Sequence, residues 1–401
     1  MKILVINAGS SSLKYQLIDM TDEKLLAKGL CERIGMGGLI SHKTADGREY
    51  KAKIDMPTHG EAFDALIYAL NKSDAKVIDS LDEIGAVGHR IVQGGAIFSK
   101  STIVNDKVIS DIESLIDLAP LHNAAHVLGI RACIKALGSE VPEVVVFDTS
   151  FHQTMPPKAF MYALPYEYYE KYKVRRYGFH GTSHRYVSDR CAAIMGCPKK
   201  DIRMITCHLG NGCSISAIQD GVCIDTSMGF TPLDGFMMGT RTGTLDPSAL
   251  TFIAEKENLS PKDVSEMCNK KSGVLGISGV SSDNRDVEKA ALKGNARAKL
   301  AIDMQRYQVV KFIGSYIAAM GGVDAIVFTG GIGENDGNLR EYMINKLSYL
   351  GIKCNLENNK TRGKEIKIST DDSKVSVYII PTNEELVIAR DTLEIVNNIK
   401  K

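Results

Sequence analysis

Four polar side chains around a small-residue turn near the N-terminus have the types and spacing of a phosphate site. Within residues 2–15, a β-branched run meets a glycine and three serines, after which the alternation of apolar and polar residues resumes. This pattern predicts a strand, a tight turn and a second strand. Asn7 and Lys14 stand at the mouths of the turn, and Ser10 and Ser12 offer hydroxyl and backbone N–H donors inside it. We expect this hairpin to hold phosphate, with an ordinary surface hairpin as the alternative.

The same pattern recurs in the middle of the chain, at residues 205–216. His208 falls where Asn7 falls in the first hairpin, 201 residues later, which is about half the chain. The recurrence predicts a duplicated domain with one phosphate hairpin in each half. Two such hairpins facing each other would grip a polyphosphate from both sides.

Two charged residues stand at the ends of predicted strands. Arg90 precedes a diglycine turn and is a candidate anion clamp. Asp148 follows the apolar strand at 143–147, and α/β proteins present their chemistry at the carboxyl ends of such strands. The alternative for Asp148 is that it caps the segment that follows.

Cations and glycine turns later in the chain suit the same chemistry. His180 lies in a small-residue turn before a helix, and Arg241 lies in a long loop at 225–247, where its guanidinium suits phosphate oxygens unless it is merely solvated. A strand at 323–329 followed by a glycine turn and a helix is a nucleotide-binding context. At the start of the last helix, Glu384 is free to meet a metal if Thr382 or Asn383 caps and Glu385 serves the helix dipole.

The elements that must position these residues indicate an α/β protein. Further strands are expected at 24–34 and 48–54, and helices at 59–71, 120–137 and 295–320. The most apolar stretch, 309–328, contains Lys311, Asp324 and three glycines, which favours a buried helix followed by a strand over a membrane span.

Length and charge favour a small-molecule site. The 401 residues are enough for two or three domains, and the net charge of +1 gives no overall attraction to nucleic acid or an anionic membrane. The N-terminal residues lack the pattern of a signal peptide, so we expect a cytoplasmic protein. Nine cysteines without a C-x-x-C pair suit reduced, packed thiols.

Two other patterns have mainly structural interpretations. The pairs His122/His126 and His180/His184 have the spacing of helical metal ligands, but neither carries the Glu of a zinc protease, which favours packing histidines. Residues 162–177 hold six of the fifteen tyrosines among basic residues. An RNA-stacking surface is one interpretation, and a packed, half-buried segment is favoured because Glu167 and Glu170 dilute the charge.

Seven short motifs, in this order along almost the whole chain, resemble the acetate kinase family, which lies in a superfamily with sugar kinases, actin and the heat-shock chaperone ATPases. They are residues 7–14, 147–155, 175–184, 208–212, 238–241, 329–335 and 381–385. The resemblance implies an α/β fold of two ribonuclease-H-like domains with a cleft between them. The first comprises residues 1–150 plus 385–401, and the second, nucleotide-binding domain comprises residues 151–384. It also implies a homodimer, with no nucleic acid or membrane as partner.

The resemblance implies Mg²⁺-dependent, reversible, direct in-line phosphoryl transfer from ATP to acetate, with Mn²⁺ as a possible substitute metal. It assigns Asp148, His180 and Arg241 to catalysis, and Asn7 and Glu384 to the metal. The acyl substrate would be bound by Arg90, Val92, Leu121, Phe179 and Pro232. The phosphates and nucleoside would be bound by Lys14, Ser10, Ser12, His208, Leu209, Gly210, Asn211, Gly212, Asp283, Asn284, Arg285, Gly331, Ile332, Gly333, Glu334 and Asn335.

The chain departs from the family pattern at three positions. Gln93 stands in place of a histidine, Asn284 in place of a larger aromatic residue and Thr244 in place of an acidic residue. We expect Gln93 to alter hydrogen bonding near the acyl pocket and Asn284 to broaden nucleotide preference. None of the three is expected to touch the transferring group.

The role of Asp148 and the choice of substrate stay open at this point. A carboxylic acid with a pKa near 4.3 is already ionised at neutral pH, so our hypothesis is that Asp148 acts electrostatically, orienting the metal and its waters, and not as a base. Val92 favours acetate without excluding propionate or butyrate, because one methylene is worth only ~1–3 kcal/mol. An actin-like or chaperone-type ATPase, which needs no acceptor, is the alternative from another class.

Overall fold

The computed structural model describes residues 1–399, the side chain of Leu121 excepted. The chain divides into two compact units, each of which is described by itself. Unit 1 runs from Met1 to Phe151 and takes in the chain from Asn383 onward, whereas unit 2 is His152–Thr382. Both units are mixed α/β structures, each built on one sheet.

Unit 1 contains an eight-stranded sheet in the order β5-β4-β3-β2-β1-β6-β8-β7. Its strands are β1 (Lys2–Ala8), β2 (Ser12–Asp19), β3 (Lys24–Glu32), β4 (Leu39–Thr44), β5 (Glu49–Lys53), β6 (Ile84–Ile91), β7 (Thr102–Ile103) and β8 (Glu143–Phe147). The hairpin prediction is confirmed, because β1 and β2 are antiparallel with Ala8 opposite Leu13. β6 runs parallel to β1, and β8 runs parallel to β6.

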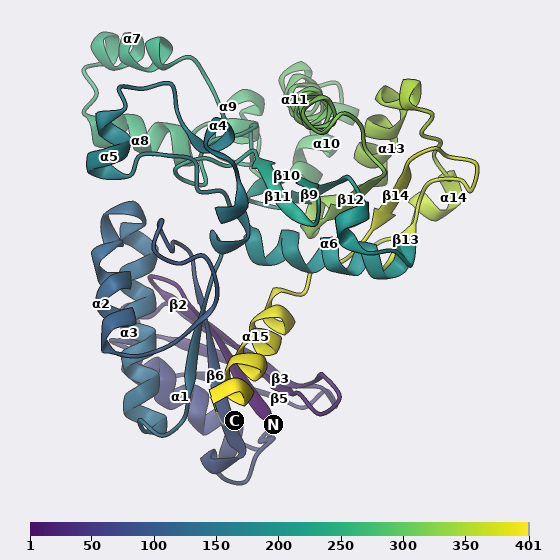
Figure 1. Ribbon diagram of the computed structural model, residues 1–401. Coiled ribbons are helices and arrows are strands. Elements are labelled where there is room, and N and C mark those ends of the chain that lie inside the picture. Colours follow the sequence, from purple (N-terminus) through teal and green to yellow (C-terminus); the bar gives the residue numbers. More distant parts are fainter. Residues whose placement is uncertain (400–401) are drawn as a thin grey trace. The chain divides into compact units, whose positions relative to one another are not determined.

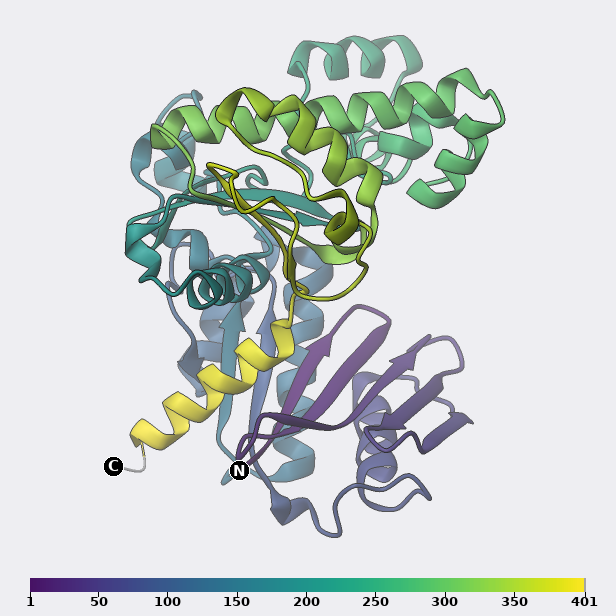
Figure 2. The same ribbon diagram turned by 90° about the vertical axis from the view of Figure 1, so that its right-hand side faces the viewer.

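Helices cover both faces of this sheet (Figures 1 and 2). One face is covered by α1 (His59–Asn71), α2 (Asp106–Ser114) and α3 (Pro120–Leu137), and the other by α15 (Glu384–Ile399). α1 begins at a capping box of Thr58 and Glu61. It buries an apolar stripe that includes Phe63 and Leu66 against the sheet, because these positions recur at helical spacing. The predicted bounds of α1, α3 and β8 are confirmed.

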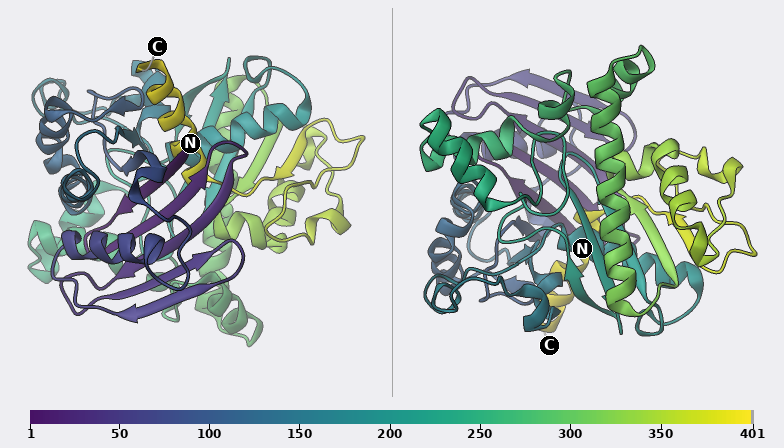
Figure 3. Two further views of the ribbon diagram at one scale, coloured as in Figure 1. Left: turned by 90° about the horizontal axis from the view of Figure 1, so that it is seen from below. Right: turned by 90° about the horizontal axis from the view of Figure 1, so that it is seen from above.

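Unit 2 contains a six-stranded sheet in the order β11-β10-β9-β12-β14-β13. Its strands are β9 (Met204–Leu209), β10 (Cys213–Gln219), β11 (Val222–Thr226), β12 (Ala325–Thr329), β13 (Ile366–Lys367) and β14 (Ser376–Ile379). α6 (Gly181–Met195) packs on β9 and β12, and the long α11 (Ala296–Met320) packs on β9 and β10 from the other face (Figures 1 and 3). The other helices are α4 (Pro157–Phe160), α5 (Glu167–Tyr172), α7 (Pro247–Glu257), α8 (Pro261–Lys270), α9 (Gly273–Ser278), α10 (Asn284–Leu292), α12 (Gly330–Asn335), α13 (Gly337–Lys346) and α14 (Leu356–Asn359).

The two sheets share one core topology. The order β3-β2-β1-β6-β8 in unit 1 matches the order β11-β10-β9-β12-β14 in unit 2, with the same strand directions. This is the ribonuclease-H-like arrangement that the resemblance implied. It confirms the duplication predicted from the two hairpins, because β1-β2 and β9-β10 occupy equivalent places.

Two features of the structure differ from the expectations, and two others agree with them. Residues 39–44 form a strand that was not expected, pairing with both β3 and β5. The tyrosine segment is less buried than predicted, since Tyr166, Tyr168 and Tyr172 are exposed. All nine cysteines are free, and seven of them are buried, as predicted. The stretch 309–328 is the end of α11 followed by β12, and among residues 1–399 no helix combines the length and apolarity that crossing a membrane requires.

Candidate active site

Three predicted residues of unit 1 meet at the carboxyl ends of adjacent parallel strands. Asn7 lies on β1, Arg90 on β6, and Asp148 directly follows β8. The Arg90 guanidinium donates to both Asp148 oxygens, from Nη2 at 2.6 Å and from Nε at 3.2 Å. Its Nη1 donates to Asn7 Oδ1 at 3.4 Å. The parallel register of β1, β6 and β8 therefore brings an amide, a guanidinium and a carboxylate together, as α/β topology predicts.

Glu384, the first residue of α15, faces the same guanidinium. Its Oε2 lies 3.9 Å from Arg90 Nε, and Asn383 Oδ1 caps the helix by accepting from the Leu386 N–H at 3.2 Å. Burial raises the pKa of Glu384 to about 7; Arg90 opposes this rise, and the carboxylates of Asp148 and Glu385 add to it. Burial lowers the pKa of Arg90, but Asp148 and Glu384 outweigh this and hold it above its ordinary value. The Arg90 guanidinium is thus held in place among the side-chain oxygen atoms of Asn7, Asp148 and Glu384.

A cavity of about 360 Å³ in unit 1 is lined by predicted residues from four elements, β1, β2, β6 and α15. Asn7, Lys14, Arg90 and Glu384 are among its walls, which continue over the exposed face of β2 to β5. The first hairpin turn is closed by a hydrogen bond from Gly9 N to Ser12 O at 2.7 Å. Lys14 is exposed, so its ammonium is available to an anion entering this cavity.

In unit 2, the second glycine turn lies against two predicted catalytic side chains. A Cβ built on Gly212 would lie 3.0 Å from His180 Nε2 and 3.3 Å from Arg241 Nη1. The absence of a side chain at this position therefore leaves room for an imidazole and a guanidinium beside the turn. Arg241 Nη1 also donates to Pro232 O at 3.1 Å, and burial lowers the pKa of Arg241. The His180 ring stacks on His208 with centroids 4.1 Å apart.

A cavity of about 1110 Å³ in unit 2 brings together half of the residues predicted to bind the phosphates and nucleoside. From the predicted sets it is lined by Gly210, Asn211, Asp283, Asn284, Arg285, Gly331, Ile332 and Asn335. Its size and its mixed walls of glycine backbone, amides and charged groups suit a nucleotide. His208, Leu209 and Gly212 belong to the neighbouring hairpin and are not among the lining residues.

Some predicted nucleoside residues have structural partners. Glu334 Oε1 accepts from the Gly330 N–H at 2.9 Å and so closes the turn after β12, where Gly330 has φ of 76°. Gly333 O accepts from Arg340 Nη1 at 2.8 Å. Neither Glu334 nor Gly333 lines the large cavity. These two residues therefore shape the loop, whereas Gly331 and Ile332 face the space beside it.

The loop at 283–285 is held by its own charges. Asp283 caps α10 by accepting from the Arg285 N–H at 2.9 Å, and it also pairs with the Arg285 guanidinium. Hydrogen bonds from Arg285 lower the pKa of Asp283 to about 2. Asn284 Nδ2 donates to Gln305 Oε1 at 2.8 Å, so its amide is fixed at the cavity wall.

The predicted acyl-pocket residues are divided between the two units. Val92, in unit 1, is buried, and its N–H donates to His126 Nε2 at 3.2 Å. Phe179 and Pro232 belong to unit 2, where Phe179 is buried. The side chain of Leu121, in unit 1, lies outside the described residues.

The predicted structural role of the histidine pairs agrees with the contacts of His126 and His184. Both are buried and hydrogen-bonded to protein groups, His126 to the backbone of Val92 and His184 to two hydroxyls. Gln93 is likewise buried, and its backbone exchanges hydrogen bonds with the Asn123 amide.

Sequence reasoning missed the hydroxyl residues behind the second hairpin. Ser183 Oγ lies 2.8 Å from His208 Nδ1, and Ser214 Oγ lies 2.8 Å from His180 Nδ1. Ser214 stands opposite His208 in the antiparallel pair of β9 and β10, but its hydroxyl contacts His180 and His184. The strand register therefore gave no signal for these contacts.

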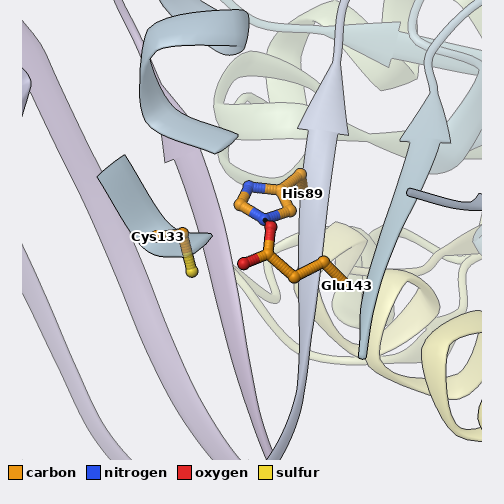
Figure 4. A group of neighbouring side chains, drawn as sticks. All are labelled: His89, Cys133 and Glu143. Atoms are coloured by element: carbon orange, nitrogen blue, oxygen red, sulfur yellow. Dashed lines mark hydrogen bonds and ion pairs between the residues drawn. The ribbon is translucent and has the colours of Figure 1, made fainter. Parts of the chain in front are cut away.

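A buried group of three side chains lies between β6, β8 and α3 (Figure 4). The atoms of His89, Cys133 and Glu143 that could bind a metal all lie within 4.8 Å of one another, and His89 Nε2 lies 2.9 Å from Glu143 Oε2. Structural zinc sites have four protein ligands, and three-ligand sites keep a position open to water or substrate. With all three side chains buried, we interpret the group as a histidine–glutamate hydrogen bond beside a thiol whose pKa burial raises.

Comparisons with known proteins give one consistent result. The sequence model of the Acetokinase family matches residues 2–390. An acetate kinase of Lachnoclostridium phytofermentans is 56% identical over 396 residues, covering 99% of this chain and 100% of the relative. The crystal structure of Porphyromonas gingivalis acetate kinase matches with a TM-score of 0.95 and 48% identity, covering 98% of this chain and 99% of that one. A propionate kinase structure from Francisella tularensis matches with a TM-score of 0.90 and 43% identity, at the same coverage.

Proposed function

Because the chain belongs to the acetokinase family, we propose that it transfers the terminal phosphoryl group of ATP to acetate, reversibly, giving acetyl phosphate and ADP. In the forward direction an acetate oxygen forms the new bond to phosphorus as the bond from phosphorus to the ADP oxygen breaks. ADP leaves with the electron pair of that bond.

The observation that carries the proposal is the hydrogen bonding of Arg90. A guanidinium has five N–H donors, and the structure assigns three of those of Arg90 to Asp148 and Asn7. Among the residues that the structure describes, no other acceptor is hydrogen-bonded to this guanidinium, so one N–H on each terminal nitrogen is left for a ligand. Two parallel donors of this kind suit a carboxylate. Arg90 would therefore hold the acceptor acid with one oxygen directed to phosphorus.

The donor nucleotide would be bound by unit 2. Its large cavity would take the nucleoside against Asn284 and Ile332, and its glycine turn would approach the phosphates through backbone N–H groups. His180 Nε2 and Arg241 Nη1, both close to Gly212, would stabilise the charge on the equatorial oxygens of the transferring group.

The residues at the carboxyl end of β1 and at the start of α15 fit a hard divalent cation. Asn7 and Glu384 offer oxygen ligands, the type that Mg²⁺ prefers. A bound cation would stabilise the ionised form of Glu384 and so oppose the burial that raises its pKa. We propose that these two residues hold Mg²⁺. When bound, the ion supplies charge neutralisation on the phosphates.

Asp148 would position Arg90 and would not act as a base. Acetate needs no base at neutral pH, because it is already ionised. Both Asp148 oxygens already accept from Arg90, which fixes the plane of the guanidinium. These two hydrogen bonds support an electrostatic role for Asp148. The group that Asp148 would orient is then Arg90, and not the metal and its waters.

The test is to incubate the protein with ATP, Mg²⁺ and acetate, propionate or butyrate, and to trap acyl phosphate with hydroxylamine. Hydroxamate that depends on acetate is expected, and Arg90→Ala should abolish most of it. Arg48→Ala, which removes an exposed arginine of the same unit, is the matched control. ATP hydrolysis without an acceptor would contradict the proposal and support an ATPase.

The relative rates with the three acids decide the substrate. The propionate kinase among the similar structures makes propionate the second candidate, and a higher kcat/KM for propionate would establish it. Val92 is the unit 1 side chain to vary, since one methylene in an apolar pocket changes discrimination by ~1–3 kcal/mol.

We also propose a cytoplasmic homodimer. The free cysteines suit a reducing compartment, where ATP is also available. Light scattering should give twice the chain mass of 43.7 kDa, and a single chain mass would contradict the dimer.

A further inference from the structure

Behind His180 in unit 2, three side chains form a continuous line of hydrogen bonds. Thr206 Oγ1 lies 2.7 Å from His184 Nδ1, and His184 Nε2 lies 2.7 Å from Ser214 Oγ. Ser214 Oγ in turn lies 2.8 Å from His180 Nδ1. Thr206, His184 and Ser214 are fully buried, so each of their protons needs an acceptor inside the protein.

The groups come from three elements of the unit 2 core. Thr206 lies on β9, Ser214 on β10 and His184 on α6, which packs on β9. His180 directly precedes α6. The line therefore rests on a rigid sheet and helix, and it ends at the imidazole that approaches Gly212.

Counting protons leaves only two directions for the line. A hydroxyl has one proton, so Ser214 donates to one imidazole and accepts from the other. Burial keeps the pKa of His184 well below its ordinary value, so His184 is neutral and also donates on one side only. The whole line therefore runs either from Thr206 towards His180 or from His180 towards Thr206.

The burial of Thr206 selects the first direction. Among the described residues, the structure gives Thr206 Oγ1 no hydrogen-bond partner except His184. If Thr206 only accepted, its own O–H would be buried without an acceptor, which is costly. If Thr206 donates to His184 Nδ1, then His184 Nε2–H donates to Ser214 and Ser214 O–H donates to His180 Nδ1. The ring proton of neutral His180 then lies on Nε2.

We propose that Ser214, supported by His184 and Thr206, is a positioning residue that fixes the tautomer of His180 with its proton on Nε2. The proposal rests on the phosphoryl transfer proposed above. Nε2 is the nitrogen that lies close to Gly212, which Arg241 Nη1 also approaches. An N–H at this nitrogen donates to a phosphoryl oxygen, whereas the other tautomer of the neutral ring would present a lone pair to an anion.

The arrangement predicts that kcat of the Ser214→Ala enzyme falls by an amount that depends on pH. At neutral pH this variant lets His180 adopt either tautomer, so kcat should fall about 2- to 12-fold, the range of one buried hydrogen bond. At a pH low enough to protonate the ring, both nitrogens carry protons and the deficit should shrink. The KM for ATP should change little, because Ser214 is buried and His180 is expected to act on the transferring group.

Other titratable groups lie near His180 and come from several elements. His208 on β9 stacks on the His180 ring, and Arg241 from the loop approaches Gly212 beside it. His184 is linked to His180 by the hydroxyl of Ser214. Farther out, burial lowers the pKa of His152 to about 3 and raises that of Cys213 to about 12. Neither of these outer groups titrates between pH 5 and 8.

The experiment measures kcat and KM between pH 5 and 8 for the wild type, Ser214→Ala, Ser214→Thr and Thr206→Val. Ser216→Ala is the matched control, because Ser216 is a buried serine on the same strand whose hydroxyl pairs with Thr226 instead. Ser214→Thr, which keeps a hydroxyl, should retain kcat, and Ser216→Ala should show no loss specific to neutral pH. A deficit that is equal at every pH, or shared by Ser216→Ala, would overturn the proposal.

Nitrogen-15 NMR of histidine-labelled wild-type protein provides a readout independent of catalysis. The His180 signals, assigned from their loss in His180→Gln, should show a protonated Nε2 and a bare Nδ1 at neutral pH. A bare Nε2 would overturn the proposal even if the Ser214 and Thr206 variants failed to fold. If the wild type formed no acyl phosphate but showed the expected tautomer, the proposed function would fail and the tautomer assignment would stand.

Discussion

Asp148→Asn removes one charge from the group that holds Arg90, and its effect follows from the hydrogen bonds. Two of the three bonds that fix the guanidinium go to Asp148, at 2.6 and 3.2 Å. An asparagine keeps one acceptor oxygen and turns the other position into a donor that faces a donor. One charge-assisted hydrogen bond, worth about 1.5–3 kcal/mol, is lost.

That loss corresponds to a fall of about 10- to 150-fold in kcat/KM for acetate, since about 1.4 kcal/mol is tenfold. The assay is hydroxamate formation at saturating ATP and Mg²⁺ with varied acetate. Asp111→Asn, in an exposed pair with Lys107, is the matched control and should behave as wild type. Near wild-type kcat/KM in Asp148→Asn would contradict the role of Asp148 in positioning Arg90. If the substitution removed only the rise of kcat/KM with pH on the acidic side of the profile, Asp148 would act as a base instead.

Three further changes test other parts of the structure. Gly212→Ala places a Cβ 3.0 Å from His180 Nε2, so activity should fall at least tenfold with the thermal midpoint nearly unchanged; Gly314→Ala, with open space around its Cβ, should keep full activity, and equal losses in both would count against the site. Glu143→Ala leaves buried His89 without its 2.9 Å partner and should lower the free energy of unfolding by about 1–3 kcal/mol in urea titrations, whereas Glu143→Gln, which keeps an acceptor, should lose less; no loss in either would contradict the assigned pair. Burial raises the pKa of Glu384 from 4.5 to about 7, so the folded state binds this proton more tightly and stability should fall as pH rises from about 4.5 to 7; Glu384→Gln should flatten that decline, and an unchanged slope would mean that Glu384 does not titrate there.

The sequence was sufficient for the elements that local chemistry determines. The glycine and serine turns predicted both hairpins, and their recurrence predicted the duplicated topology, because a turn residue limits the backbone regardless of distant contacts. The short strand at 39–44 escaped prediction, since it is stabilised by pairing with β3 and β5 and not by a strong pattern of its own. The exposed tyrosines of α5 were also misjudged, because composition does not tell which face a ring covers.

The residues of the site were predicted better than their partners. Arg90 and Asp148 were recognisable from their positions at strand ends, but the hydrogen bonds between them depend on the parallel register of β6 and β8. Ser214 and Thr206 have no chemical signature in the sequence. Their importance arises only when β9, β10 and α6 bring two imidazoles to within hydrogen-bond distance of their hydroxyls.

Phosphorus-31 NMR of ATP turnover in the presence and absence of acetate is the most direct test of direct phosphoryl transfer to acetate. ADP and acetyl phosphate should appear together only when acetate is supplied, with ¹⁸O from labelled acetate in the bond to phosphorus. Inorganic phosphate released at the same rate with and without acetate would contradict it.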